Sequence, residues 1–256
     1  MTAQGVSRRE RVRQATLAEI RAAARRLLIE QGSQAVTINA VAREMGMSGP
    51  ALYHYFAGHE ELVGAVTADF FRELTQAMET ARDACPPGEH AARLLAACRA
   101  MRSWAVSHRA EFGWVFASPI TAERRPDSPR ELAGRDFEQV FLEEIAELWE
   151  HRPFPVPDPG ELPASIREQL RAYAASTGMG LPVEAIHVFM SCWIRLYGLL
   201  CMEVLNQLDF VYSDMEPVFE ECLREIAPRL GLDYETAAGP AVSPPRGRSA
   251  RGGPGS

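Results

Sequence analysis

The sequence lacks the features that mark common catalytic and cofactor sites. Its 256 residues include no lysine, no C-x-x-C pair and no glycine-rich phosphate loop, and its histidines and cysteines are not spaced as metal ligands usually are. His108 and His187 are candidate general bases, but neither has a recognisable nucleophile beside it. We therefore expect no enzymatic activity, no cofactor and no metal site. A helical enzyme built on one of these histidines is the alternative.

The sequence also gives little indication of disulfide bonds, of export or of a membrane span. The cysteines are odd in number and scattered, as is typical of reduced thiols in a cytoplasm; they are Cys85, Cys98, Cys192, Cys201 and Cys222. Residues 1–14 are polar and arginine-rich, without the apolar segment of a signal peptide. The most apolar stretch, residues 185–202, contains Arg195 and has no flanking anchors, which argues against a membrane span. We expect a cytoplasmic protein that makes no membrane contact.

Strand-like alternation is absent and helical signals are frequent, so the sequence predicts an all-α fold. The first helix ends at Gly32 and begins at one of two capping boxes, at Ser7 or at Thr16. Ser213 begins a further capping box. The other expected helices are residues 59–84, 89–109, 110–117, a segment ending near 151, 165–176, 183–208 and 214–230.

Residues 37–56 have the pattern of two short helices joined by a tight turn. Thr37 can cap the first helix, and Gly46 can take the left-handed conformation that ends it. Ser48 can cap the second helix only a few residues later. The two helices have an apolar side, which comprises Ile38, Val41, Ala42, Met45, Leu52 and Phe56. This spacing predicts a helix-turn-helix, whose second helix lies in a DNA groove.

The charge of the chain is divided in a way that suits DNA binding. The net charge is −7, but residues 1–60 carry 8 arginines and 5 acidic residues. The positive charge therefore gathers at the helix-turn-helix end, where a polyanion would bind.

These residues resemble the TetR (TetR/AcrR) family of one-component bacterial transcriptional regulators. The resemblance is specific over residues 16–62 and weaker beyond them. It is carried by residues 24–28, Gly32, Thr37, Ile38, Val41, Ala42, residues 46–48, residues 51–56 and residues 60–62. It implies an N-terminal three-helix DNA-binding domain followed by a larger helical domain for ligand binding and dimerisation.

The resemblance, together with the basic N-terminus, predicts the DNA contacts. Phosphate or groove contacts are expected from Thr37, Ser48, Tyr53 and Tyr55, and base-edge positions are Gly49, Pro50 and Ala51. Because those three offer no side-chain hydrogen bond, Arg43, His54 and DNA shape should supply more of the specificity. His59 departs from the family pattern, which often has lysine there. A flexible arm over residues 1–15 would carry Arg8, Arg9, Arg11 and Arg13 to a minor groove, or would be a solvated tail.

The remaining domains follow from the same reading. We expect a DNA-binding domain over residues 16–62, a ligand-binding and dimerisation domain over 63–232 and a disordered tail over 233–256. Homodimerisation through residues 183–208 and 214–230 would place two heads on a pseudo-palindromic operator in double-stranded DNA.

A small, largely apolar inducer is the expected ligand of the larger domain. Its candidate lining residues are Trp104, His108, Phe112, Phe116, Met190, Trp193 and Tyr197, which can equally be ordinary core residues. Arg102 and Arg195 can favour an anionic ligand if buried, pair with Glu203, or lie at the surface. The predicted function is a homodimeric repressor released by ligand. A constitutive dimeric DNA-binding protein without an inducer, or an activator, stays open.

Overall fold

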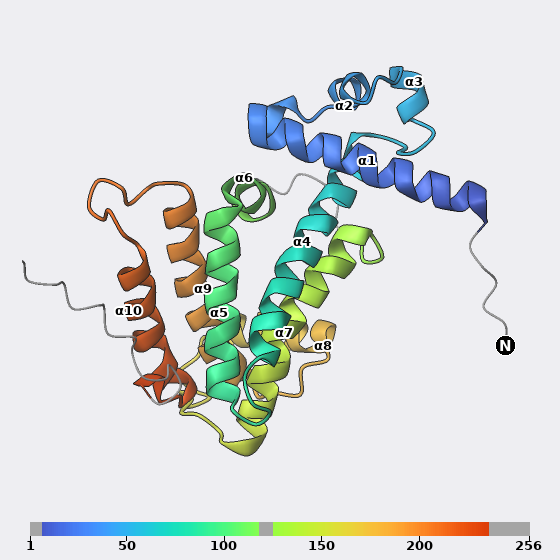
Figure 1. The fold of residues 1–256 in the computed structure, drawn as a ribbon. Coiled ribbons are helices and arrows are strands. Elements are labelled where there is room, and N and C mark those ends of the chain that lie inside the picture. The colour runs from blue at the N-terminus through green and yellow to red at the C-terminus, as the bar shows by residue number, and fades with distance from the viewer. Residues whose placement is uncertain (1–6, 118–124, 236–256) are drawn as a thin grey trace, which may run out of the picture.

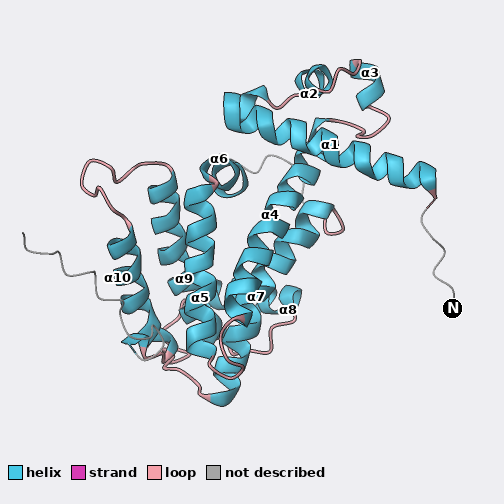
Figure 2. Cartoon of the chain, in the orientation of Figure 1, coloured by secondary structure: helices cyan, strands magenta, loops and turns pink. Residues whose placement is uncertain are grey.

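The computed structural model describes residues 7–117 and 125–235, and within these ranges the chain is helical with no strand (Figures 1 and 2). The all-α prediction is therefore confirmed. The helices are α1 (Arg8–Gln31), α2 (Ile38–Glu44), α3 (Gly49–Leu52), α4 (His59–Asp83), α5 (His90–Ser107), α6 (Arg109–Phe112), α7 (Pro129–His151), α8 (Ala164–Thr177), α9 (Val183–Val204) and α10 (Glu216–Ile226). A π-helical turn, Gly113–Ala117, follows α6, and 3-10 turns lie at Ser33–Ala35 and Ala227–Leu230.

Helices α1 to α3 form a head at one end of the molecule, and α4 leads from the head into the body (Figure 1). The local rules read from the sequence hold here. Thr37 Oγ1 accepts a hydrogen bond from the Ala40 amide at 3.2 Å and so caps α2. Gly46 has a φ of 65°, the left-handed conformation that ends α2. Leu52 and Phe56 are buried against α1 and α2 side chains in one continuous core.

The body is built around α4, α5 and α7, which pack against one another, while α9 packs on α5 and in turn contacts α8 and α10 (Figure 1). Its aromatic centre is contributed by α4, α7, α9 and the π-helical turn. In the described residues α9 is the one helix long and apolar enough to cross a membrane, judged by length and composition alone. In the structure it packs on α5, α8 and α10.

The expected flexible arm is wrong for residues 8–15, which form the first two turns of α1. The earlier of the two capping boxes is used: Ser7 Oγ accepts from the Glu10 amide at 3.2 Å. A side-chain bond from Gln14 to Glu10 and the contact of Arg13 with the head support these turns. Residues 1–6 lie outside the described residues.

Three other local predictions need correction. Ser48 lies at the N-cap of α3, but its side chain makes no capping hydrogen bond. Ser213 does not cap α10; Asp214 Oδ1 accepts from the Glu216 amide at 2.9 Å instead. The helix expected over residues 183–208 ends at Val204, where Asn206 takes a φ of 55°.

The tail begins later than expected. Tyr234 is buried, and its hydroxyl donates to Glu220, so residues 233–235 belong to the folded body. The ring also receives the guanidinium of Arg224 over its face, 4.7 Å from the centroid. Residues 236–256 lie outside the described residues.

Candidate DNA interface and regulatory core

The exposed face of the head carries most of the predicted DNA contacts. Side chains that are largely open to solvent there are Arg8, Arg9, Arg11, Arg13, Thr37, Arg43, Ser48, Pro50, Tyr53, His54 and His59. Tyr53 is 55% exposed, which is unusual for an aromatic residue without a partner. Because the Ser48 hydroxyl has no capping role, it is available to a phosphate oxygen.

At Gly49, α3 lies close to the side chain of an α2 residue. A Cβ at this position would lie 2.9 Å from Oδ1 of Asn39, a residue that the sequence analysis did not single out. Gly49 and Ala51 are half-buried beside this contact. A larger side chain at Gly49 would therefore displace the exposed side chain of Asn39.

Two of the expected contacts are partly used within the chain. Tyr55 is half-buried, packs on the core and has the Arg13 guanidinium 5.7 Å from its ring centroid. The Nη1 of Arg13 donates to the His54 carbonyl at 3.4 Å. Arg13 and Tyr55 thus brace the second helix of the motif on α1, and Tyr55 is less open to solvent than the sequence analysis expected.

His59 is held by the head. Its ring nitrogen Nε2 lies 2.7 Å from the Val36 carbonyl oxygen. A carbonyl only accepts, so Nε2 carries the proton. On a neutral ring Nδ1 is then an acceptor, which cannot donate to a phosphate. A neutral His59 is therefore a poor substitute for the lysine that its family pattern leads one to expect.

The candidate ligand residues lie in the body, where the structure brings most of them together. Phe112 and Phe116 meet with ring centroids 4.7 Å apart, Phe116 meets Tyr197 at 5.9 Å, and Tyr197 stacks on Trp193 at 5.6 Å. Trp104 and His108 form a separate stack at 4.8 Å. Met190 packs on the core, but makes none of these ring contacts.

The enclosed space near these residues is small. A cavity of about 30 Å³ lies between α5, α7, α9 and α10 and is almost wholly apolar. Trp193 is the one candidate residue that lines it, beside Phe141, Phe189 and Leu196. Sites for drug-sized ligands enclose about 300–1,000 Å³, so a ligand has to displace side chains here.

One short segment joins this core to the head. The Tyr197 hydroxyl on α9 donates to the Phe116 carbonyl at 2.5 Å, and Trp114 Nε1 donates to Thr67 Oγ1 on α4 at 2.9 Å. Burial raises the pKa of Tyr197 to about 12, with a smaller contribution from Cys201, so this hydroxyl keeps its proton. Glu111 on α6 accepts from Arg25 Nε on α1 at 2.9 Å. We call residues 109–117 the connector.

Arg25 ties the connector and α4 to the head. Its Nη1 also donates to Glu73 on α4 at 2.6 Å, and its guanidinium lies 5.2 Å from the Phe70 ring centroid. The Glu111 side chain is only 4% exposed, so its charge depends on this partner. The pair joins residues 86 positions apart in the chain, and no local pattern in the sequence marked it.

Both arginines that were considered for an anionic ligand are paired within the chain. Arg102 donates to both carboxylate oxygens of Glu203, at 2.7 and 3.0 Å, which is one of the roles that the sequence left open. Arg195 takes another of those roles, since its side chain is 48% exposed at the surface, where it pairs with Glu225 on α10. Neither guanidinium is free for an anionic ligand.

Comparison with known proteins places this geometry in a family. The profile of bacterial regulatory proteins of the tetR family matches residues 20–66, and the profile of the tetracyclin repressor-like C-terminal domain matches residues 94–226, a little over half of the chain. The chain belongs to the TetR family. This is the family of bacterial regulators that the sequence resembled.

Individual TetR-family relatives agree. The HTH-type transcriptional regulator Rv1816 of Mycobacterium tuberculosis is 30% identical over 129 residues, which are 50% of this chain and 54% of that protein. Its counterpart Mb1846 of Mycobacterium bovis matches equally. The chain therefore spans about half the length of the curated relatives it matches.

Solved structures share the fold across both domains. The regulatory protein SCO4313 has a TM-score of 0.63 at 26% identity, over 87% of this chain and all of that one. A protein from Rhodococcus sp. RHA1 has a TM-score of 0.56 at 20% identity, over 84% and 94% of the two chains.

Proposed function

We propose that this TetR-family protein is a cytoplasmic homodimeric repressor that a small, largely apolar ligand releases from a pseudo-palindromic operator. The connector carries this proposal. It touches the aromatic core through Tyr197, α4 through Thr67 and α1 through Arg25, so a ligand that repacks the core cannot leave all three contacts unchanged. A π-helical turn within such a segment is a frequent feature of functional sites.

The small size of the cavity means that the proposed ligand would bind one arrangement of the core more tightly than another. Because about 30 Å³ of space is too little for an organic ligand, binding requires a second, more open arrangement of Phe116, Trp193 and their neighbours. A ligand that binds only the open arrangement shifts the population towards it. A coupling of about 1–3 kcal/mol would lower operator affinity by about 5–150-fold.

An exposed apolar stripe on α9 supports the dimer. Only 33% of the apolar segment of α9 is buried within the chain. Ile194 is accordingly 65% exposed and Met202 39% exposed. Gly198 lies between them on the same side of the helix, and a Cβ there would meet nothing within 4 Å. Leu205 continues the stripe, at 46% exposure. Apolar patches of this kind mark protein interfaces.

The exposed side of α10 has a different composition. It is mainly charged, with Glu221, Arg224 and Glu225 open to solvent. We therefore assign the centre of the proposed interface to the α9 stripe, and its rim to α10.

The packed core also favours a second candidate, a constitutive dimeric regulator without an inducer. A core that cannot open would dimerise and bind DNA equally well. The two candidates differ in whether any small molecule weakens DNA binding.

The first experiment measures fluorescence anisotropy on DNA from beside the gene of this protein, at about 150 mM salt. We expect tight binding that random DNA competes poorly. Tyr53→Phe should weaken it by about tenfold, because one hydrogen bond to a charged phosphate is lost from an exposed side chain that the fold does not need. Equal binding to random DNA would contradict the proposal. A screen of apolar aromatic compounds against the complex then separates the two candidates.

A further inference from the structure

The end of the body farthest from the head holds a cluster of potential metal ligands. His90 begins α5, and Glu147 and His151 lie one turn apart near the end of α7. One ligand atom from each of the three lies within 4.8 Å of the others. No metal site was predicted from the sequence, which has no local spacing typical of metal ligands. His90 is more than fifty residues from the other two, and only the packing of α5 on α7 brings them together.

Each imidazole uses its Nδ1 in a hydrogen bond, which leaves Nε2 as the nitrogen that can bind a metal ion. His151 Nδ1 lies 2.8 Å from the Glu147 carbonyl oxygen, and His90 Nδ1 lies 3.2 Å from Glu144 Oε2. These oxygens accept, so each Nδ1 carries its proton and each Nε2 keeps its lone pair. In metal-binding histidines, the ring nitrogen that does not bind the metal usually donates its N–H to a carboxylate or a carbonyl.

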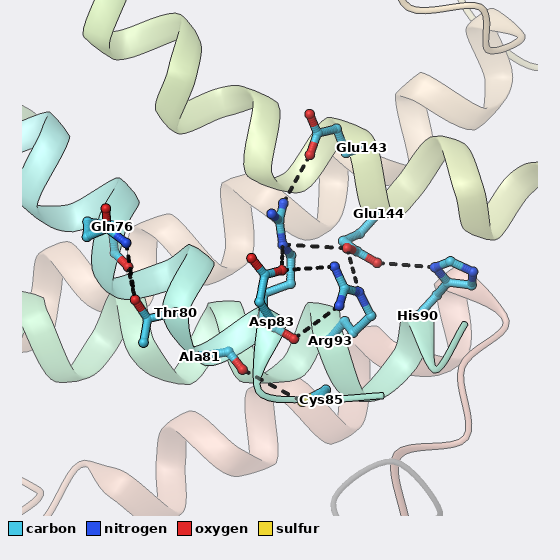
Figure 3. A network of polar contacts seen from close by, with 10 residues as sticks. Gln76, Thr80, Ala81, Asp83, Cys85, His90, Arg93, Glu143 and Glu144 are labelled. Atoms are coloured by element: carbon cyan, nitrogen blue, oxygen red, sulfur yellow. Dashed lines mark hydrogen bonds and ion pairs between the residues drawn. The ribbon is translucent and has the colours of Figure 1, made fainter. Parts of the chain in front are cut away.

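Glu144 is a rigid support for His90 (Figure 3). Its side chain is 5% exposed, and its Oε1 accepts from Arg93 Nε at 2.8 Å and lies 3.7 Å from Arg82 Nε. Arg93 also reaches Asp83 at 3.1 Å, which fixes the guanidinium in turn. The support therefore joins α4, α5 and α7, while Glu147 and His151 remain open to solvent.

We propose that His90, Glu147 and His151 bind one Zn²⁺ ion. Two imidazole nitrogens and one carboxylate oxygen suit zinc, whereas Mg²⁺ and Ca²⁺ prefer oxygen ligands throughout. Ligand atoms on tetrahedral zinc are about 3.3 Å apart, given bonds of about 2.0–2.1 Å. Glu147 and His151 are 55% and 64% exposed, so their side chains have room to change rotamer and approach this spacing. For His151 this change breaks its hydrogen bond to the Glu147 carbonyl. Water completes the fourth position.

The ion would clip α5 to α7 at the end of the body opposite the DNA-binding head. The site is also linked to the last turn of α4, because Glu144 contacts both His90 and Arg82. This site is separate from the aromatic core and from the connector, and its existence does not depend on the proposed ligand response.

The test titrates Zn²⁺ into tag-free, chelator-treated full-length protein by calorimetry. We expect one ion per chain. Zinc at 100 times its Kd should raise Tm by about 5–10 °C. His90→Gln and His151→Gln should each weaken binding at least tenfold, and His187→Gln, a histidine on α9, should leave it unchanged. Glu144→Gln should weaken binding by about 10–100-fold, because it loosens the support of His90.

Co²⁺ gives an independent reading of the ligands. A four-coordinate spectrum without a thiolate charge-transfer band is expected, and it should disappear in His151→Gln, whose exposed side chain the fold does not need. A thiolate band, or Zn²⁺ binding that survives in His90→Gln/His151→Gln, would place the metal on cysteines and overturn the proposal. Absence of one-to-one binding in the wild type would do the same.

Discussion

At the scale of single residues, we propose that residue 59 sets how strongly α4 is anchored to DNA. Nε2 is occupied by the Val36 carbonyl, and the neutral ring has no second donor. His59→Lys would add a full charge at the start of α4, where the TetR pattern often has one. We expect tighter operator binding and a plot of log K against log salt that is steeper by about 0.9, the value for one more neutralised phosphate.

The measurement is operator anisotropy at several salt concentrations. Glu143→Gln is the matched control, because it changes the net charge by the same amount on an exposed side chain of α7 far from the head. Its slope should equal that of the wild type. If His59→Lys also left the slope unchanged, residue 59 would not lie beside a phosphate.

Thiol reactivity is a second property set residue by residue. Burial raises the pKa of Cys98 to about 12 and that of Cys192 to about 11, so almost no thiolate forms at pH 8. Cys222 is also buried, and burial raises its pKa. We expect a disulfide reagent at pH 8 to modify the half-exposed Cys85 first, and Cys98 and Cys192 only after unfolding. The fast phase of thiol modification should be absent in Cys85→Ser, which checks that this phase belongs to Cys85. Rapid modification of Cys98 in the native protein would contradict this view of the core.

At the scale of elements, α10 is fastened to α5 by a pair that acid should break. Arg99 donates to both oxygens of Glu220 at 2.8 Å, and the hydroxyl of Tyr234 adds a third bond. The bonds from Arg99, and then from Tyr234, hold the pKa of Glu220 below its ordinary value of 4.5. A carboxyl with a lowered pKa in the folded state stabilises the fold above its unfolded pKa, and this contribution is lost as pH falls through the folded value.

Glu220→Gln should therefore cost about 1–3 kcal/mol of unfolding free energy at pH 7, since a partly buried charged pair is broken. The difference from the wild type should shrink as pH falls below 4.5, and urea unfolding at several pH values measures it. Glu221→Gln, whose side chain is 60% exposed, should change stability by less than about 0.5 kcal/mol. A gap that stays constant down to pH 3 would show that the Glu220 charge has no part in the effect.

The Arg25–Glu111 pair is the element contact on which the proposed switch depends. Neither residue belongs to the predicted DNA-contact set, so a change in operator affinity on breaking the pair must act through the placement of the head. We expect Glu111→Gln to change affinity by at least 5-fold, the lower end of usual allosteric couplings. Glu143→Gln again controls for the lost charge. A double-mutant cycle with Arg25→Gln separates the pair from its members, and additive effects would remove the connector from the mechanism.

At the scale of the whole molecule, the sequence predicted what short-range rules decide. The Thr37 cap, the Gly46 turn and the extent of α4 need only a few neighbouring residues to be read, and all three are confirmed. Where two local signals compete, the sequence could not choose: Ser7 caps α1 rather than Thr16, and Asp214 replaces Ser213. Contacts such as Arg25 with Glu111, or His90 with Glu144, join distant segments and follow only from packing.

The proposed recognition of a pseudo-palindromic operator requires two chains to assemble, and Gly198 allows a sharp test of that assembly. A side chain at this position meets no atom of its own chain within 4 Å, and replacing glycine inside a helix favours the helix. Gly198→Leu should therefore keep the helical content of the wild type, while the loss of a partner subunit lowers its Tm. If α9 packs on its twin through Ile194, Gly198 and Met202, the same substitution should shift sedimentation from dimer to monomer at micromolar concentration.

Operator affinity should fall with it, because each head alone makes only half of the phosphate contacts. Gly64→Ala in α4 is the matched control: its Cβ also meets nothing within 4 Å, and it lies outside the stripe. Ile194→Glu should reproduce the monomer by placing a charge on the most exposed residue of the α9 stripe, since desolvating an unpaired carboxylate is costly. A dimer that survives both Gly198→Leu and Ile194→Glu would move the interface to another face, and the half-site spacing of about 34–36 Å would then have to be set by different helices.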